Sequence, residues 1–142
     1  MKKILKLIFL ILIVVIVILI MHCLKNKQFI DFFYDKKTIR ENLILDLKNE
    51  KIKVDDNNIV ILSDKYNNLA ENNFIRVFRC DNEECLVSFL YKAGFPDEDV
   101  YVIYSSTDDE LIKKYIDKNL YKFIKKIDNN WYLVQYNWFF QW

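Results

Sequence analysis

The longest run of apolar positions lies near the N-terminus of the chain. Fifteen consecutive apolar residues extend from Leu7 to Met21, and Leu24 closes the run after two weakly polar positions. As a helix, residues 7–24 would be about 27 Å long, slightly short of a hydrocarbon core of about 30 Å. Flanking Lys6 and Lys25 can reach the headgroups by snorkelling. The pattern predicts a basic tail over 1–6 and a transmembrane signal-anchor helix over 7–24.

Three other interpretations of this run are less well supported by its residues. A cleaved signal peptide needs small residues before the cleavage site, but no Ala, Gly or Ser occurs before Ser63. A lipoprotein signal with its lipid on Cys23 also needs a small residue just before the cysteine, and His22 stands there. A buried helix that is apolar all round would need a far larger protein to cover it. We therefore expect an uncleaved single-pass anchor.

Residues 25–35 form a juxtamembrane segment that contains a cluster of aromatic side chains. Phe29, Phe32, Phe33 and Tyr34 lie close to the expected end of the anchor. Tyrosine and other aromatic residues suit the interface between membrane and water. The same four residues could instead begin the core of the following domain, and the sequence leaves both interpretations open.

The remaining residues, 36–142, show the patterns of a small α+β domain. Thr38 and Glu41 have the spacing of a capping box, and the apolar positions that follow predict a helix over about 39–50. A short apolar run predicts a strand over 59–62, and the Asn-rich residues 64–73 are typical of a loop.

Two similar apolar runs, 74–80 and 85–91, predict a β-hairpin with a four-residue loop. In the expected register Cys80 faces Cys85, Phe78 faces Val87 and Phe74 faces Tyr91, so all six side chains lie on one face. A further strand is predicted over 100–104, after a turn that holds the single Gly and the single Pro.

The last part of the domain contains a second helix and a second hairpin. Thr107 and Glu110 form another capping box, and Leu111, Ile112, Tyr115 and Ile116 give the following helix an apolar face. The Asn-rich turn 128–130 joins the runs 121–127 and 131–136 as a hairpin, although the helical period also extends to Ile127. The expected fold class is α+β, an N-terminal transmembrane helix followed by about two helices and five to six antiparallel strands.

Charge is distributed unevenly over these two parts. The 142 residues carry a net charge of +1, which gives no reason to expect a nucleic-acid partner. Residues 1–27 contain five lysines and no acid, whereas residues 28–142 contain 16 basic and 20 acidic residues, a net charge of −4. A basic, apolar leader joined to a mildly acidic domain favours a lipid bilayer as one partner.

The cysteines give the most specific chemical prediction outside the apolar run. Directly opposed residues of a hairpin have Cα separations suited to a disulfide, so we expect Cys80 and Cys85 to be bonded. The bond would imply an oxidising compartment. Two buried free thiols are the main alternative. A metal site lacks further ligands nearby, and a redox catalyst would be expected to have a Cys-x-x-Cys motif.

The usual catalytic and cofactor-binding motifs are missing from the sequence. His22 is the one histidine, so no Ser-His or Cys-His pair forms in the domain. A single glycine excludes Gly-rich phosphate loops. Three carboxylate clusters, at 81–84, 97–99 and 108–110, fall at turns and a helix start, where acids serve local roles. We therefore predict no catalytic, cofactor-binding or metal-binding residues.

The C-terminal end of the chain is unusually aromatic. Trp138, Phe139, Phe140 and Trp142 stand among the last five residues, and their exposure to water would be costly. They either complete the core of the domain or contact a partner.

These features together favour a membrane-anchored, non-enzymatic binding protein of a bacterial-type cell envelope. An immunity or inhibitor protein that masks an envelope toxin is one concrete version, and another envelope protein is then the expected partner. The alternatives are an accessory subunit of a larger membrane complex and a carboxylate-dependent envelope enzyme. The Met-Lys-Lys start resembles a secretory n-region. We accordingly expect the N-terminus inside, in the cytoplasmic membrane, and the domain outside, although the lysine counts alone do not favour this orientation.

Overall fold

The computed structural model describes residues 2–92, 99–116, 118 and 121–136, with side chains described outside 2–5, 7, 22–26, 28 and 123. The chain divides into two compact units, Met1–Thr38 and Ile39–Trp142. The described residues of the first unit are all helical, and the second unit contains the end of that helix together with all the described strands.

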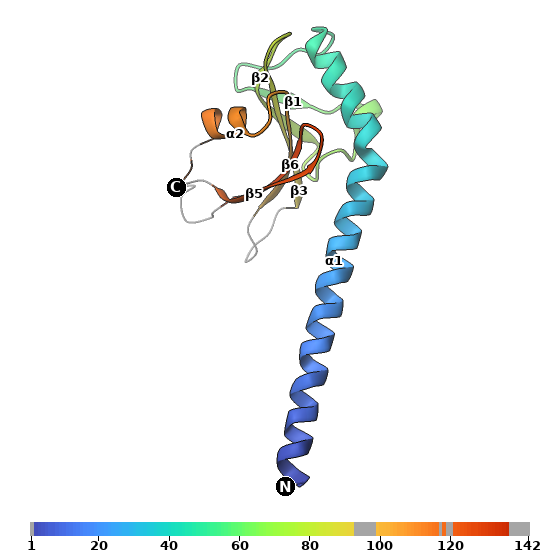
Figure 1. Cartoon of the computed structure of the whole chain (residues 1–142). Helices are drawn as coiled ribbons and strands as arrows, with labels where there is room; N and C mark the ends of the chain where they lie inside the picture. The colour runs from blue at the N-terminus through green and yellow to red at the C-terminus, as the bar shows by residue number, and fades with distance from the viewer. Residues whose placement is uncertain (1, 93–98, 117, 119–120, 137–142) are drawn as a thin grey trace. The chain divides into compact units, whose positions relative to one another are not determined.

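A single continuous helix, α1 (Lys2–Lys48), accounts for the first third of the chain (Figure 1). The prediction that a separate helix begins at Ile39 is therefore wrong. A capping residue needs a non-helical backbone, but the stretch before Thr38 contains neither Gly nor Pro to interrupt the helix. The capping-box pattern at Thr38 and Glu41 consequently lies inside a helix.

The N-terminal part of α1 exposes an unbroken apolar surface. All fourteen residues from Ile8 to Met21 have relative exposures between 42% and 64%. Within the part of the chain that the structure describes, no helix combines the length and the apolar character needed to cross a membrane. The transmembrane segment predicted over 7–24 is thus unsupported by the structure.

The second unit contains an antiparallel sheet, which confirms the predicted α+β class. In the described residues the sheet has six strands in the order β1-β2-β3-β4-β6-β5, within the five to six that were expected. The strands are β1 (Ile59–Ile61), β2 (Phe74–Cys80), β3 (Cys85–Lys92), β4 (Val100–Ser105), β5 (Tyr121–Asp128) and β6 (Trp131–Tyr136). A short 3-10 helix, η1 (Asp64–Tyr66), lies within the segment predicted as a loop.

The hairpin of β2 and β3 has the predicted four-residue loop, although β3 ends one residue later than predicted and the register differs. Cys80 pairs with Cys85, whereas Val87 pairs with Val77 and Phe89 pairs with Ile75. The predicted pairs of Phe78 with Val87 and of Phe74 with Tyr91 are therefore wrong. A β-bulge between Val77 and Arg79 adds one residue to β2, and this shifts every pair beyond it. In the observed register Ile75 and Val77 are buried, whereas Phe74 and Phe78 are only partly buried.

The final hairpin is formed by β5 and β6, which confirms the hairpin over the continued helix. The order of the two strands in the sheet was not predictable from their order in the chain. β6 pairs with the central strand β4, and β5 forms the outer strand.

Helix α2 (Glu110–Tyr115) packs on one face of this sheet. Its side chains Leu111 and Ile112, with Ile116 just beyond its end, belong to a cluster that also contains Leu86, Ile103, Tyr132 and Val134. We call this side of the sheet the α2 face. The helix is capped by Asp109 without a side-chain hydrogen bond, so the predicted capping box at Thr107 is wrong.

The opposite face of the sheet carries the second part of the core. Phe89 and Trp131 are fully buried there, with their ring centroids 5.9 Å apart. The C-terminal turns of α1 contribute the buried side chains Leu43, Ile44 and Leu47. Strand β3 is buried from Cys85 to Leu90 because both faces of the sheet are covered along it.

Candidate functional site

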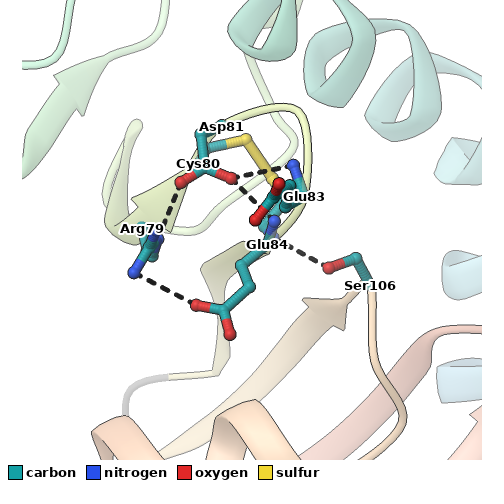
Figure 2. The surroundings of a disulfide bond; sticks show 7 residues. Arg79, Cys80, Asp81, Glu83, Glu84 and Ser106 are labelled. Atoms are coloured by element: carbon teal, nitrogen blue, oxygen red, sulfur yellow. Dashed lines mark hydrogen bonds and ion pairs between the residues drawn. A yellow bond between two sulfur atoms is a disulfide. The ribbon is translucent and has the colours of Figure 1, made fainter.

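The most distinctive chemical feature of the second unit is the disulfide at the end of the β2–β3 hairpin (Figure 2). The bond joins Cys80 and Cys85, whose Cα atoms are 3.9 Å apart, and it is the bond that the sequence predicts. Cys85 has its backbone N–H directed to Ser106 Oγ at 2.8 Å and its carbonyl to Ser106 N–H at 3.0 Å. The backbone N–H and carbonyl groups of Cys85 therefore point toward Ser106, which follows β4, and away from β2. The cysteines consequently form a non-hydrogen-bonded pair of β2 and β3, the kind that brings opposed residues closest.

The loop inside the disulfide is organised by Asp81. The Asp81 N–H donates to the Glu84 carbonyl at 2.9 Å, and Asp81 Oδ1 accepts from the N–H groups of Glu83 at 2.9 Å and Glu84 at 2.7 Å. These backbone donors, together with Arg79, hold the pKa of Asp81 at about 2. The carboxylate at 81 thus serves the turn, as predicted for this acidic cluster.

Charged side chains connect this hairpin end to α2. Arg79 contacts Asp81 Oδ2 through Nε at 2.7 Å and Glu84 Oε2 through Nη1 at 3.2 Å. Lys114 of α2 contacts Glu84 Oε1 at 3.3 Å, and Arg79 Nη1 donates a hydrogen bond to the Tyr115 hydroxyl at 3.3 Å. Exposed ion pairs contribute little stability each. Beside the disulfide, the positive charges of Arg79 and Lys114 balance the negative charges of Asp81 and Glu84.

Two acidic side chains of the third predicted cluster, Asp108 and Asp109, also have local partners. Asp108 accepts from Lys126 at 2.7 Å and from the Tyr132 hydroxyl at 3.1 Å, and Asp109 pairs with Lys113 at 2.6 Å. No group of three or more potential metal-ligating side chains gathers within the described residues. The chemistry of this region is therefore ion pairing and turn stabilisation.

The aromatic tail proposed as a partner contact cannot be placed on this framework. Trp138, Phe139, Phe140 and Trp142 lie outside the residues that the structure describes. The choice between core and interface for these four residues stays a prediction.

The environments of two arginines, Arg40 and Arg76, were not predicted from the sequence. Arg40 is fully buried, donates to the Leu69 carbonyl at 3.4 Å and lies 5.7 Å from the Phe89 ring centroid. Burial lowers the pKa of Arg40 to about 10. Arg40 precedes Leu43 by three residues and Ile44 by four, so it lies on the same buried face of α1 as they do. Arg76, by contrast, is exposed on the α2 face beside buried Ser88.

Comparisons with known proteins give no relative for this chain. No protein-family model, no curated protein sequence and no solved structure matches it.

Proposed function

We propose that the protein is a membrane-anchored, non-enzymatic binding protein of the cell envelope. The observation that carries the proposal is the exposed apolar surface of α1 from Ile8 to Met21. Fourteen consecutive apolar side chains are costly to expose to water. On the membrane-insertion scale each Leu, Ile, Phe or Val favours lipid by about 0.3–0.6 kcal/mol at the centre of a helix.

The sequence around this surface supports insertion into a bilayer. Leu7 precedes it and Leu24 follows it, so that the apolar run extends to 18 positions in the sequence. Lys6 precedes the run, and Lys25 and Lys27 follow it. A helix also satisfies its own backbone hydrogen bonds, which lipid requires. We propose that residues 7–24 anchor the chain in the cytoplasmic membrane.

The disulfide supports an extracytoplasmic position for the second unit. A bond between Cys80 and Cys85 persists in an oxidising compartment, and the basic N-terminal tail then remains inside. Tethering confines the domain to a surface and raises its effective concentration near envelope partners. More specifically, we propose that the chain is an immunity or inhibitor protein that masks an envelope toxin.

Membrane attachment is tested by expressing the full chain in a bacterial host and fractionating the cells. We expect the chain in the membrane pellet after alkaline carbonate extraction. The double variant Leu12→Asp/Ile16→Asp should move to the soluble fraction, because each central acid opposes insertion by about 3 kcal/mol. Ile61→Asp is the matched control, since Ile61 is 82% exposed on β1, and it should stay in the membrane. Wild-type chain found in the carbonate supernatant would exclude the anchor.

Orientation is tested by labelling an Ile61→Cys variant in intact cells with a maleimide that does not cross membranes. Labelling before lysis is expected if the second unit lies outside. Labelling only after lysis would place the unit in the cytoplasm and would exclude an envelope partner for it.

The binding function is tested by crosslinking the full chain in native membranes and identifying the products by mass spectrometry. A single partner at fixed stoichiometry supports a binding protein. A toxin or envelope enzyme as that partner supports the immunity version, whereas several subunits of one assembly would favour the accessory-subunit alternative.

A further inference from the structure

The two outer strands of the sheet differ in how their outer edges are covered. At β1, the Ile59 N–H donates to Asp55 Oδ1 at 2.5 Å, and the Ile59 carbonyl accepts from the Asp55 N–H at 3.1 Å. The turn before β1 therefore occupies the outer edge of this strand at Ile59. The other outer strand is β5, which has eight residues against three in β1. A long outer strand is a template for pairing with another strand.

The hydrogen bonds of β6 show which backbone groups of β5 face outward. Tyr136 donates its N–H at 3.0 Å to the carbonyl of Asp99, which directly precedes β4. The Asn130 carbonyl accepts from the N–H of Ser105 at 2.8 Å. Because backbone direction alternates along an antiparallel strand, the even-numbered residues of β6 bond toward β4. The odd-numbered residues consequently bond toward β5.

The alternation leaves an open stretch in the middle of β5. Leu133 is an odd-numbered residue of β6 and pairs with Lys125, so the backbone groups of Lys125 point toward β6. Ile124 and Lys126, on either side, direct their N–H and carbonyl groups away from β6. Among the residues that the structure describes, these four outward groups have no hydrogen-bond partner. They have the spacing that an added strand needs.

The side chains of β5 determine which strand fits this edge. Ile124 packs against the cluster on the α2 face, and Lys125 projects from the opposite face because side chains alternate along a strand. Lys125 is exposed, and it makes no hydrogen bond or ion pair within the described part of the chain. An added strand would lie beside an apolar side chain on one face and a positive charge on the other. Alternating apolar and acidic residues match both.

Charge argues against a second copy of β5 as the added strand. The strand contains three lysines and one aspartate, although residues 28–142 as a whole carry a net charge of −4. Two β5 strands side by side would bring like charges together, which destabilises the pairing. Lysines on an outer strand also discourage unselective association. An acidic strand of a different protein avoids this repulsion.

We propose that the outer edge of β5 at residues 124–126 binds one extended strand of an acidic partner protein. The partner strand places apolar residues beside Ile124 and carboxylates beside Lys125. Backbone hydrogen bonds supply the affinity in this mode of recognition, and the alternating side chains supply the specificity. The inference rests on the proposed binding function, to which it adds the docking surface and the kind of partner.

The proposal is tested with two octapeptides, one of alternating Glu and Val and one of alternating Lys and Val, both acetylated and amidated. Each is titrated calorimetrically into the full chain in a neutral detergent. Saturable binding of the acidic peptide alone is expected. Lys125→Glu should weaken this binding by about tenfold or more, because it replaces attraction with repulsion. Lys53→Glu is the matched control, since Lys53 is exposed and precedes β1, and it should leave the affinity unchanged.

A second pair of variants distinguishes strand addition from attraction between charges. Lys126→Pro and Lys126→Ala both lose the contact of Lys126 Nζ with Asp108, which is 2.7 Å long. Only proline also removes the outward N–H, and an outer strand tolerates proline where its N–H faces solvent. Lys126→Pro should therefore bind the acidic peptide about tenfold more weakly than Lys126→Ala. Melting curves show whether each variant is folded, and Lys125→Glu tests the edge without proline.

Three results would overturn the proposal. They are the absence of saturable binding of the acidic peptide, equal binding of the two peptides, and equal affinities of folded Lys126→Pro and Lys126→Ala. Crosslinking in native membranes keeps this test separate from the proposed function. A partner that is lost in Lys126→Pro and kept in Lys126→Ala supports the edge as its docking surface. A partner kept in both variants would exclude the edge and leave the binding function intact.

Discussion

Tyr66 donates a hydrogen bond from its phenol to the carboxylate of Asp46. The contact joins the 3-10 helix η1 to the last turns of α1. Lys65 Nζ lies 2.9 Å from the same carboxylate, and Lys51 Nζ lies 3.5 Å from it. The hydrogen bond from Tyr66 is the largest cause that lowers the pKa of Asp46 to about 2, followed by the hydrogen bond from Lys65.

This contact predicts a specific loss of stability in acid. The pKa of Asp46 lies below its unfolded value of 3.8, so the ionised carboxylate stabilises the fold above about pH 4. The contribution disappears as the pH falls toward 2. Urea unfolding of the full chain between pH 7 and pH 2 should show a smaller acid-dependent loss in Asp46→Asn than in wild type. Asp81, whose pKa is also about 2, keeps part of the dependence in both proteins. Identical pH dependence in the two would show that the Asp46 contact contributes nothing.

Removal of the disulfide should destabilise the domain without unfolding it. The bond closes a short loop, so the double variant Cys80→Ser/Cys85→Ser should lose about 2 kcal/mol of unfolding free energy. The hairpin end is also closed by the hydrogen bonds of Asp81, and this supports a folded variant. A reductant should destabilise wild type and leave the variant unchanged in urea titrations. A completely unfolded variant would contradict the role assigned to Asp81.

Packing of α2 should depend strongly on a single buried side chain. Ile112 is fully buried in the cluster on the α2 face, and Ile112→Ala should cost about 2–4 kcal/mol through lost contacts and a cavity. Neighbouring Lys113 is exposed and makes an i,i+4 ion pair with Asp109. Lys113→Ala should therefore change the unfolding free energy far less than Ile112→Ala does. Comparable losses in the two variants, measured by denaturant unfolding, would show that α2 does not rely on this cluster.

A glycine should stabilise the C-terminal end of α1. Glu50 has a positive φ of 55°, and the bonds from Glu50 N–H to Leu47 and from Lys51 N–H to Asp46 form a Schellman motif. Because glycine adopts this conformation without a Cβ clash, Glu50→Gly should raise the unfolding free energy by about 0.5–1 kcal/mol.

The matched control for this substitution is Asn68→Gly. Asn68 also has a positive φ, 63°, but asparagine tolerates the left-handed region better than glutamate does. The control should change the unfolding free energy by only a few tenths of a kcal/mol. An equal gain in both variants would mean that the backbone angle at Glu50 is not the cause.

Much of this architecture could be predicted from local patterns. The strands at 74–80 and 131–136 match the expected runs to the residue, because Asn-rich and acidic turns define where each strand stops. The cysteines on either side of a four-residue loop predict their own bond, since the hairpin brings them opposite each other. Such features depend only on neighbours in the chain, and the sequence contains all that is needed to infer them.

Other features required contacts between distant residues. The bulge between Val77 and Arg79 accompanies the burial of Ile75 and Val77, and the alternation of apolar residues along the strand does not predict it. The capping-box residue Thr38 lies inside α1, because helix continuation depends on the residues before it. Strand order likewise required distant contacts, since β6 lies beside β4 and β5 forms the outer strand. The sequence by itself determined the apolar leader, the hairpins and the disulfide, which are set by short-range geometry. Only the tertiary structure decided register, strand order and which polar side chains were left without partners, because these depend on burial summed over the whole sheet.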